Sequence, residues 1–564
     1  MKKLIALLLV FVMAFGLTAC GNAKEGSENT DFEAPAEQWD GALPLVQEGE
    51  DNVITIGLRT NTNVTDYNDN AYTHWLEEQT GVDVQFVQFA GSAGDAATQI
   101  SLMMASGEKL PDILYDFSGI KKAMGEEYGR DGYFLNVKDY FDHYSFYQKQ
   151  SFRQLLGDEW EPIYNNFMSR ASSDGNIYCF PAFGISPLDF PKFHPWINTR
   201  WLEALELEAP TNIEELYDVL VAFRDGDPNG NGKKDEIPMI GIANDGFADC
   251  VMWVINAFQF INMGSHYNVT DDGTVWLPYD TDEYRQALQF LNKLVKEGLL
   301  SQLTWTISPA ENEALINATA TGEYTVGVIC GHADTQFIKD GDAIYAYDPL
   351  PPLADATGSG GYGPQATYSQ SYVTYITADC ENPLLAFKLL DFMCSQESFL
   401  RQRYGEYGVD WKYVDGGLGH LGGEAKIELL NPNFYNEQNN GSWRGAFGVS
   451  SEWDWEQLTD PEADPWNYTK NMKLVQNYEY SEAASQPKNV YYAPAYTLEE
   501  NEIRNAVKPD VEEYLKVSRA EFCTGVRDPY SDADWQSYLD ALKALGYYDD
   551  FLTPAQSAWD RING

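Results

Sequence analysis

Apolar and polar residues along the chain alternate with the periods of strands and helices in turn. Residues 53–58 and 82–89 show the two-residue period of a half-buried strand, and a further strand-like stretch begins at residue 111. Residues 70–79 and 96–105, which lie between these stretches, have apolar positions spaced as in amphipathic helices. This strand–helix–strand–helix–strand order predicts an α/β fold with an open, mostly parallel sheet.

The sequence that follows these strands contains residues suited to holding a ligand. Ligands of open α/β sheets lie outside the carboxyl ends of the strands, so residues directly after a strand are the first candidates. Four candidates follow the first or third strand, one follows the apolar stretch that ends at residue 330, and one ends the strand-like "IYCFPAF". Two tryptophans lie in loop-like sequence, where an indole ring can stack on a sugar. The predicted ligand contacts are Asn61, Thr62, Asp116, Phe117, Phe183, Trp305, His332 and Trp443.

The stretch "RDGDPNGNGKKDEIPM" (224–239) places oxygen-bearing side chains at alternate positions around three glycines. Ca²⁺ takes about six to eight oxygen ligands with loose geometry, which such a loop can supply. A register that begins at Asp225 satisfies the pattern D-x-[DN]-x-[DN]-G-x5-E, but it has Gly232 where an EF-hand usually has an apolar residue. We therefore prefer a register that begins at Asp227. Its predicted ligands of a structural Ca²⁺ are the side chains of Asp227, Asn229, Asn231, Asp235 and Glu236 and the backbone carbonyl of Lys233. A surface turn without metal is the alternative, since Gly and Asn favour turns for backbone reasons alone.

The N-terminus has the pattern of an export signal. Two lysines precede an apolar run over residues 4–17, which is followed by small residues and Cys20. The run is too short and wrongly flanked for a stable membrane span. The pattern resembles a bacterial lipobox, which implies a signal peptide over residues 1–19 and a diacylated Cys20. Residues 20–50 are mostly polar and acidic, and we expect them to form a flexible tether.

The chain is strongly acidic, with 86 Asp and Glu against 37 Lys and Arg and a formal net charge of −49. Such a surface repels nucleic acid and anionic lipid, so we expect no nucleic-acid partner and membrane contact only through the lipid. The sequence contains no G-x-S-x-G, H-E-x-x-H or P-loop motif that would indicate a catalytic triad, a zinc protease or a nucleotide site. Six cysteines besides Cys20 lie mostly among apolar neighbours, and we expect them to be buried thiols; an oxidised pair is the alternative in an exported protein.

Six longer stretches carry a family resemblance that covers nearly all of residues 50–564. They are "AYTHWLEEQTGVDV" (71–84), "LMMASGEKLPDIL" (102–114), "DGNIYCFP" (174–181), "WINTRWLEALELEAPTNIEELYDVLVAFRDGDPNGNGKKDEIPM" (196–239), "YGVDWKYVDG" (407–416) and "FCTGVRDPYSDADWQSYLDALKALGYYDDF" (522–551). Together they resemble bacterial extracellular solute-binding protein family 1, the sugar-binding lipoproteins of ABC importers. The calcium loop resembles that of the alginate-binding members, which supports the register from Asp227.

The resemblance implies a two-lobed, periplasmic-binding-protein-like fold of type II. Each lobe is expected to hold a mixed sheet flanked by helices, and the chain is expected to cross the hinge several times. The implied N-terminal lobe comprises residues 51–183 and 352–393. The implied C-terminal lobe comprises residues 184–351 and 394–564 and carries the calcium loop at 225–236.

The function that this resemblance implies is capture of a carbohydrate, expected to be an oligosaccharide, in a cleft between the lobes. The ligand would then pass to the permease subunits of an ABC importer. We expect a monomeric receptor, anchored on the extracellular face of the cell membrane, without enzymatic activity. One alternative is a secreted calcium-containing glycoside hydrolase, which needs two carboxylates about 5 to 10 Å apart in one cleft. Another is a receptor of the same fold for a peptide or another small solute.

Overall fold

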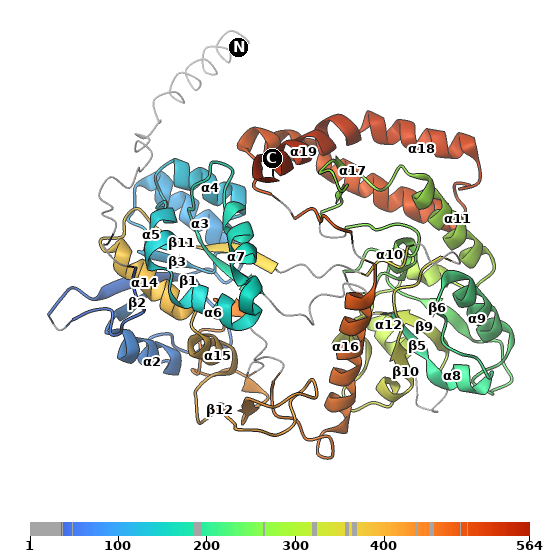
Figure 1. The fold of residues 1–564 in the computed structure, drawn as a ribbon, viewed down its shortest axis with the longest axis horizontal. Helices are drawn as coiled ribbons and strands as arrows, with labels where there is room; N and C mark the ends of the chain where they lie inside the picture. Colours follow the sequence, from blue (N-terminus) through green and yellow to red (C-terminus); the bar gives the residue numbers. More distant parts are fainter. Residues whose placement is uncertain are drawn as a thin grey trace, which may run out of the picture. The chain divides into compact units, whose positions relative to one another are not determined.

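The computed structural model divides the chain into two compact units (Figure 1). Unit 1 comprises Met1–Gly184, Ser369–Lys412 and Leu429–Ser451, and unit 2 comprises Ile185–Tyr368, Tyr413–Glu428 and Glu452–Gly564. The structure describes residues 35, 38–47, 49–184, 195–246, 248–262, 265–317, 324–355, 360–363, 369–434, 437–445, 447–450, 456–485, 487–492 and 494–563. The predicted signal peptide and Cys20 lie outside the described residues.

Unit 1 is built on a mixed six-stranded sheet with the strand order β14-β4-β11-β3-β1-β2. Its strands are β1 (Val53–Arg59), β2 (Asp83–Phe89), β3 (Ile113–Tyr115), β4 (Phe180–Gly184), β11 (Ser369–Ile376) and β14 (Val449–Ser450). The first three are parallel to each other, and β11 is antiparallel to both β3 and β4. β4 therefore runs in the same direction as β1, β2 and β3.

Both faces of this sheet are covered, as the alternation of side chains along β3 shows. Ile113 and Tyr115 belong to one hydrophobic cluster, and Leu114 between them belongs to another. A strand that is buried on both faces is apolar at every position, which explains the unbroken "ILY". The helices of unit 1 are α2 (Ala71–Thr80), α3 (Ala93–Ser106), α4 (Lys122–Arg130), α5 (Lys138–Tyr144), α6 (Tyr147–Leu156), α7 (Trp160–Ser169), α14 (Pro383–Met393) and α15 (Gln396–Tyr404).

A buried carboxylate joins two parts of unit 1 that lie far apart in the sequence. Asp391 on α14 is fully buried and accepts hydrogen bonds from the backbone N–H groups of Phe146 (2.9 Å), Tyr147 (2.7 Å) and Gln148 (3.2 Å). The Ser145 hydroxyl donates a fourth bond, of 3.3 Å. The first N–H groups of a helix have no partner within the helix, so Asp391 supplies the acceptor that the start of α6 lacks.

Unit 2 has a smaller mixed sheet with the strand order β10-β5-β9-β6. Its strands are β5 (Pro195–Asn198), β6 (Ile237–Ile240), β9 (Val326–Cys330) and β10 (Tyr347–Pro349), and β7 (Asn268–Val269) pairs with β8 (Val275–Trp276) in a separate ribbon. The helices are α8 (Thr199–Ala204), α9 (Ile213–Asp225), α10 (Cys250–Asn256), α11 (Asp282–Lys296), α12 (Pro309–Ile316), α13 (Ala333–Gln336), α16 (Pro465–Ala483), α17 (Leu498–Thr524), α18 (Asp532–Ala544) and α19 (Thr553–Asn563). The chain passes between the units again near β12 (Trp411–Tyr413) and β13 (Ile427–Leu429).

Helix α11 shows how the sequence pattern determines packing in unit 2. Tyr284, Leu288, Leu291 and Val295 recur at helical spacing and are almost fully buried. They belong to the same core cluster as residues of α17, such as Leu515. The charged residues between them lie on the other side of the helix, so one apolar stripe fixes the helix to the core.

The elements predicted from periodicity are present with shifts of a few residues. The predicted strand 82–89 is β2, and the predicted helices 70–79 and 96–105 are α2 and α3. Two-unit architecture with mixed sheets agrees with the predicted fold class.

The division into units differs from the predicted lobes after the first boundary. Residues 394–412 and 429–451 belong to unit 1, although they were expected in the C-terminal lobe, and residues 352–368 belong to unit 2. The cause is packing: Phe399 and Leu400 of α15 and Trp443 are buried in unit 1. Sequence periodicity does not show which sheet a returning segment joins.

The six cysteines in the described ranges, Cys179, Cys250, Cys330, Cys380, Cys394 and Cys523, are free thiols. Five are buried, and Cys380 is partly buried. Among the described helices, none has both the length and the apolar character that a bilayer crossing needs.

Candidate ligand-binding site and calcium loop

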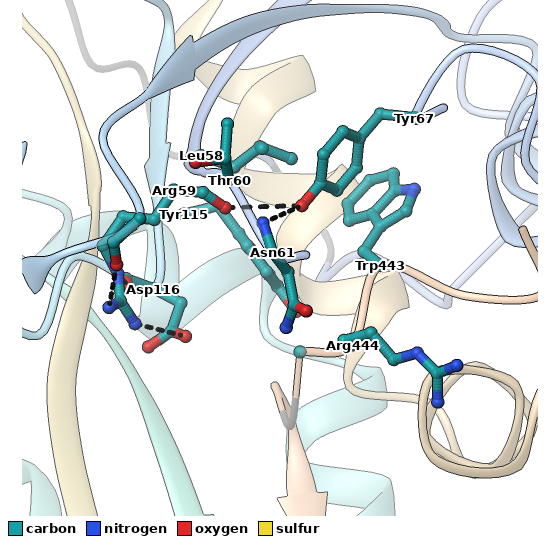
Figure 2. Close-up of a pocket in the computed structure, with 11 residues that line it drawn as sticks. Leu58, Arg59, Thr60, Asn61, Tyr67, Tyr115, Asp116, Trp443 and Arg444 are labelled. Carbon is teal, nitrogen blue, oxygen red and sulfur yellow. Dashed lines mark hydrogen bonds and ion pairs between the residues drawn. The ribbon is translucent and has the colours of Figure 1, made fainter. Parts of the chain in front are cut away.

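A polar pocket lies at the carboxyl ends of the parallel strands in unit 1 (Figure 2). Its volume is about 130 Å³. The lining residues come from the ends of β1 and β3, from the loops after β1 and β2, and from the segment before β14; they are Leu58, Arg59, Thr60, Asn61, Tyr67, Gly91, Tyr115, Asp116, Trp443, Arg444 and Gly445. This is the position at which an open α/β sheet holds its ligand.

An arginine–aspartate pair forms one wall of the pocket. Arg59 Nη2 lies 3.3 Å from Asp116 Oδ2, and Arg59 Nε donates to the Asp116 carbonyl at 3.0 Å. Nη1 donates to the Gly91 carbonyl at 3.3 Å, so the guanidinium is held at three points. Burial raises the pKa of Asp116, and the charge of Arg59 opposes part of that rise. The pair presents fixed donors and acceptors side by side, which suits a ligand rich in hydroxyl groups.

Two aromatic side chains hold the opposite wall in place. The Tyr67 hydroxyl accepts from the Asn61 backbone N–H at 3.0 Å and donates to the Arg59 carbonyl at 3.4 Å (Figure 2). Trp443 is only 4% exposed, and its Nε1 donates to Thr73 Oγ1 at 2.7 Å. Its ring is therefore fixed in the core, with one side facing the pocket.

Two residues at this pocket have a strained backbone conformation. Asp116 and Arg444 both have positive φ, of 55° and 61°, a conformation that non-glycine residues rarely adopt. Arg444 is kept in place by stacking on Phe434, at 4.2 Å, and by a hydrogen bond from Nη2 to the Glu437 carbonyl of 2.6 Å. A Cβ atom at Gly445 would lie 2.2 Å from the Tyr115 hydroxyl, so a larger residue does not fit. Such strain is commonest at functional sites, where the surrounding structure enforces it.

The structure brings three of the eight predicted ligand contacts together: Asn61, Asp116 and Trp443 line the pocket. Thr62 lies in the adjoining turn and accepts a hydrogen bond from Gln438 through its carbonyl, at 3.1 Å. Phe117 lies outside the pocket, because its side chain is fully buried against Phe89.

The other three predicted contacts lie in other surroundings. Phe183 is buried against Phe152 and Phe167 in the core of unit 1. Trp305 packs partly buried on the core of unit 2. His332 follows β9 in unit 2, and its carbonyl accepts from the backbone N–H groups of Thr335 and Gln336 in α13.

Sequence reasoning missed Arg59, Tyr67, Tyr115 and Arg444. The first and third end β1 and β3, so the rule that identified Asn61 and Asp116 could have found them. Tyr67 lies in the loop after β1, which the same rule places at the ligand site. Arg444 carries no such signal, because tertiary packing alone brings it to the pocket.

The loop after α9 contains the predicted calcium ligands. Asp227 Oδ1 accepts from the backbone N–H groups of Asn231 (3.1 Å) and Gly232 (3.2 Å). The Asn231 side-chain amide donates to Asp235 Oδ1 at 3.1 Å. Glu236 Oε1 is buried without a hydrogen-bond partner in the described structure, and burial followed by the charge of Asp235 raises the pKa of Glu236. An acceptor left in this state fits a cation that would complete its bonding.

Within the described ranges, no group of three or more Asp, Glu, His or Cys side chains is placed so that it could hold a metal ion. The predicted set relies on amide and backbone carbonyl oxygens as well, which Ca²⁺ accepts. Asp225, the first residue of the alternative register, forms an ion pair with Arg224 at 2.7 Å instead.

The two α/β units and the polar pocket at the strand ends define a ligand-binding protein of the two-domain periplasmic-binding type. Residues 61–398 match the model of the bacterial extracellular solute-binding protein family. The chain belongs to this family.

Curated relatives agree with this assignment, and solved structures agree with the fold. The chain is 25% identical over 524 residues, 88% of each chain, to the fructooligosaccharide ABC transporter substrate-binding protein FusA of Streptococcus pneumoniae. It is 34% identical over 231 residues, 40% of each chain, to Lipoprotein LipO of Bacillus subtilis. The structure of FusA with kestose matches with a TM-score of 0.64 and 23% identity over 90% of this chain and 99% of that one; a second FusA structure is of an EF-hand mutant. A solute-binding protein of Bifidobacterium longum subsp. infantis matches with a TM-score of 0.71 and 18% identity, over 92% and 100% of the two chains.

Proposed function

We propose that this protein is a monomeric, lipid-anchored extracellular receptor that captures an oligosaccharide and delivers it to the permease subunits of an ABC importer. Membership of the solute-binding family supports the transport role, and the relative FusA, whose name specifies fructooligosaccharide, supports a carbohydrate ligand. The observation that carries the proposal is the strained, pre-arranged polar pocket at the carboxyl ends of β1 and β3. The protein binds and releases its ligand without changing it chemically.

The pocket residues have distinct parts in this proposal. The Asp116 carboxylate accepts hydrogen bonds from sugar hydroxyls, and Arg59 donates to them while keeping that carboxylate in place. Trp443 and Tyr67 are almost fully buried, and they hold the pocket wall in place. Because burial raises the pKa of Asp116, affinity should fall on acidification at a higher pH than an exposed aspartate would show.

The experiment that tests the pocket is the Asp116→Asn variant. Asparagine tolerates positive φ and has the same shape, so the fold should be retained while the charge is lost. Hydrogen bonds to charged groups contribute about 1.5–3 kcal/mol, and we expect oligosaccharide affinity to fall about 10- to 100-fold in isothermal titration calorimetry. Asp131→Asn, at an exposed position after α4, is the matched control. Unchanged affinity in Asp116→Asn would remove this pocket from the ligand site.

We also propose that the loop from Asp227 to Glu236 holds a structural Ca²⁺. The EF-hand named for FusA supports a calcium loop in relatives. In this chain the buried, unpartnered Glu236 oxygen and the donor set described above fit such an ion. Bound calcium would supply positive charge among three carboxylates; the loop's own side chains fix the connection between α9 and β6.

The lipid anchor is proposed from Cys20 and from the similarity to a lipoprotein. Cys20→Ala should abolish incorporation of radiolabelled palmitate, because the thiol is the only acceptor in the predicted lipobox. The variant should then appear in the culture medium, as followed by immunoblotting of cells and medium. Retention of the variant on the membrane would contradict the proposed anchor.

A further inference from the structure

A second and larger cavity, of about 570 Å³, lies in unit 1 among α5, α6, α7 and the segment before β4. Its volume is within the roughly 300–1,000 Å³ of typical small-molecule sites. Three cationic side chains, Lys138, Lys149 and Arg153, line it together with the rings of Trp160 and Tyr164. This composition contrasts with a chain in which acidic residues outnumber basic ones by 86 to 37.

This basic cavity is separate from the polar pocket. Gly175 and Asn176, which line it, precede β4, and β4 runs parallel to β1, β2 and β3. The basic cavity therefore lies at the amino ends of the strands, whereas Asn61 and Asp116 follow the carboxyl ends. Ligands of the two sites would not compete for space.

The cationic groups are held in fixed positions. Lys138 Nζ donates to the Gly175 carbonyl at 2.8 Å, and Lys149 Nζ donates to the Phe141 carbonyl at 2.9 Å. The guanidinium of Arg153 lies over the Trp160 ring, 4.4 Å from its centroid. Within the described part of the chain these three cations form no ion pair, and Asp142 and Glu161 act on Lys149 only from a longer distance.

The remaining lining residues limit the ligand further. Asp142 and Glu161 also border the cavity, so three cations and two carboxylates leave one net positive charge. That balance matches a monoanion better than a polyanion. The carboxylates, together with the amides of Asn165 and Asn176, provide partners for hydroxyl groups, and the aromatic rings suit C–H faces.

We propose that the basic cavity is a second ligand site, for a small saccharide that carries a single anionic group. The anion would lie between Lys149 and Arg153, and the sugar hydroxyls would face the carboxylates and amides. A uronic acid carries one negative charge, and a sugar phosphate carries about one to two at pH 7. Both present one compact anionic group, and the cavity's net charge of one favours the uronic acid.

Saturation-transfer difference NMR with glucuronate, glucose 6-phosphate and glucose tests the proposal on the purified chain. We expect one of the charged sugars to bind. Which of them binds will show whether the cavity takes a carboxylate or a phosphate. Charge-assisted binding should weaken about tenfold or more in the Lys149→Gln, Arg153→Gln double variant and should weaken with added salt.

Controls assign the signal to this cavity. Asp116→Asn should leave binding of the charged sugar unchanged, and so should Lys516→Gln, which removes an exposed base on α17. The double variant must keep its melting temperature; if it does not fold, the single variant Arg153→Gln gives the same comparison. The proposal would be overturned if neither charged sugar bound, or if the double variant kept its affinity for the charged sugar. It would also be overturned if glucose bound and the double variant weakened glucose binding by the same factor.

Discussion

Replacement of Asp391 by alanine will lower the free energy of unfolding of unit 1 by about 3–5 kcal/mol. The substitution removes the acceptor of three backbone N–H groups at the start of α6, and these donors are buried or partly buried. A buried donor without a partner costs about 1–3 kcal/mol, and breaking a buried charged network has a cost at the upper end of measured effects. Urea unfolding followed by tryptophan fluorescence will show the loss.

The pH dependence of the free energy of unfolding distinguishes loss of the Asp391 carboxyl group from loss of its packing. Burial raises the pKa of Asp391 from 3.8 to about 6, so the folded protein binds this proton more tightly than the unfolded chain does. Its contribution to stability is therefore largest below about pH 4 and declines as the pH rises to about 6. Asp391→Asn should lack this step, and Asp131→Ala, at an exposed position, should keep it. A cost below about 1 kcal/mol for Asp391→Ala would contradict the bridging role.

Removal of calcium with a chelator will lower the melting temperature of the protein. Calcium that binds only the folded state stabilises it by RT ln(1 + [L]/Kd), about 2.7 kcal/mol at a hundredfold excess over Kd. Asp227→Ala combined with Glu236→Ala should abolish this calcium dependence in differential scanning calorimetry. Oligosaccharide affinity, measured well below melting, should stay nearly unchanged because the loop lies outside the polar pocket.

The alternative calcium register provides the control for this experiment. Asp225→Ala should leave the calcium dependence in place, since Asp225 is paired with Arg224 and belongs only to the register that we do not prefer. Loss of calcium dependence in Asp225→Ala would favour that register. An identical melting temperature with and without calcium in the unmodified protein would leave only a metal-free turn.

The fold could be predicted where short-range periodicity reflects burial. The strands and helices from β1 to α3 follow one another directly. In each of them, apolar and polar residues alternate with the period of that element. β11 and β14 join the same sheet from more than 180 residues further along the chain, and nothing in their local sequence specifies that sheet. The lobe boundaries after residue 184 were displaced for this reason.

The candidate site was predictable to the same extent. Asn61 and Asp116 lie in the pocket because they follow parallel strands, a relation that sequence order preserves. Phe117 and Phe183 show the limit of that rule, since the residue next to a strand end can point into the core. Trp443 lies in a loop, as expected, but tertiary packing buries its ring beside Tyr115.

The measurement that tests the central claim most directly is titration of the purified protein with a panel of oligosaccharides and peptides, followed by chromatography of each mixture. The panel should include fructooligosaccharides, which the name of FusA specifies. We predict saturable binding of at least one oligosaccharide by isothermal titration calorimetry, with the sugar recovered intact. Release of shorter sugars would indicate a glycoside hydrolase, and binding of peptides alone would indicate a receptor for another solute; either result would contradict a carbohydrate receptor.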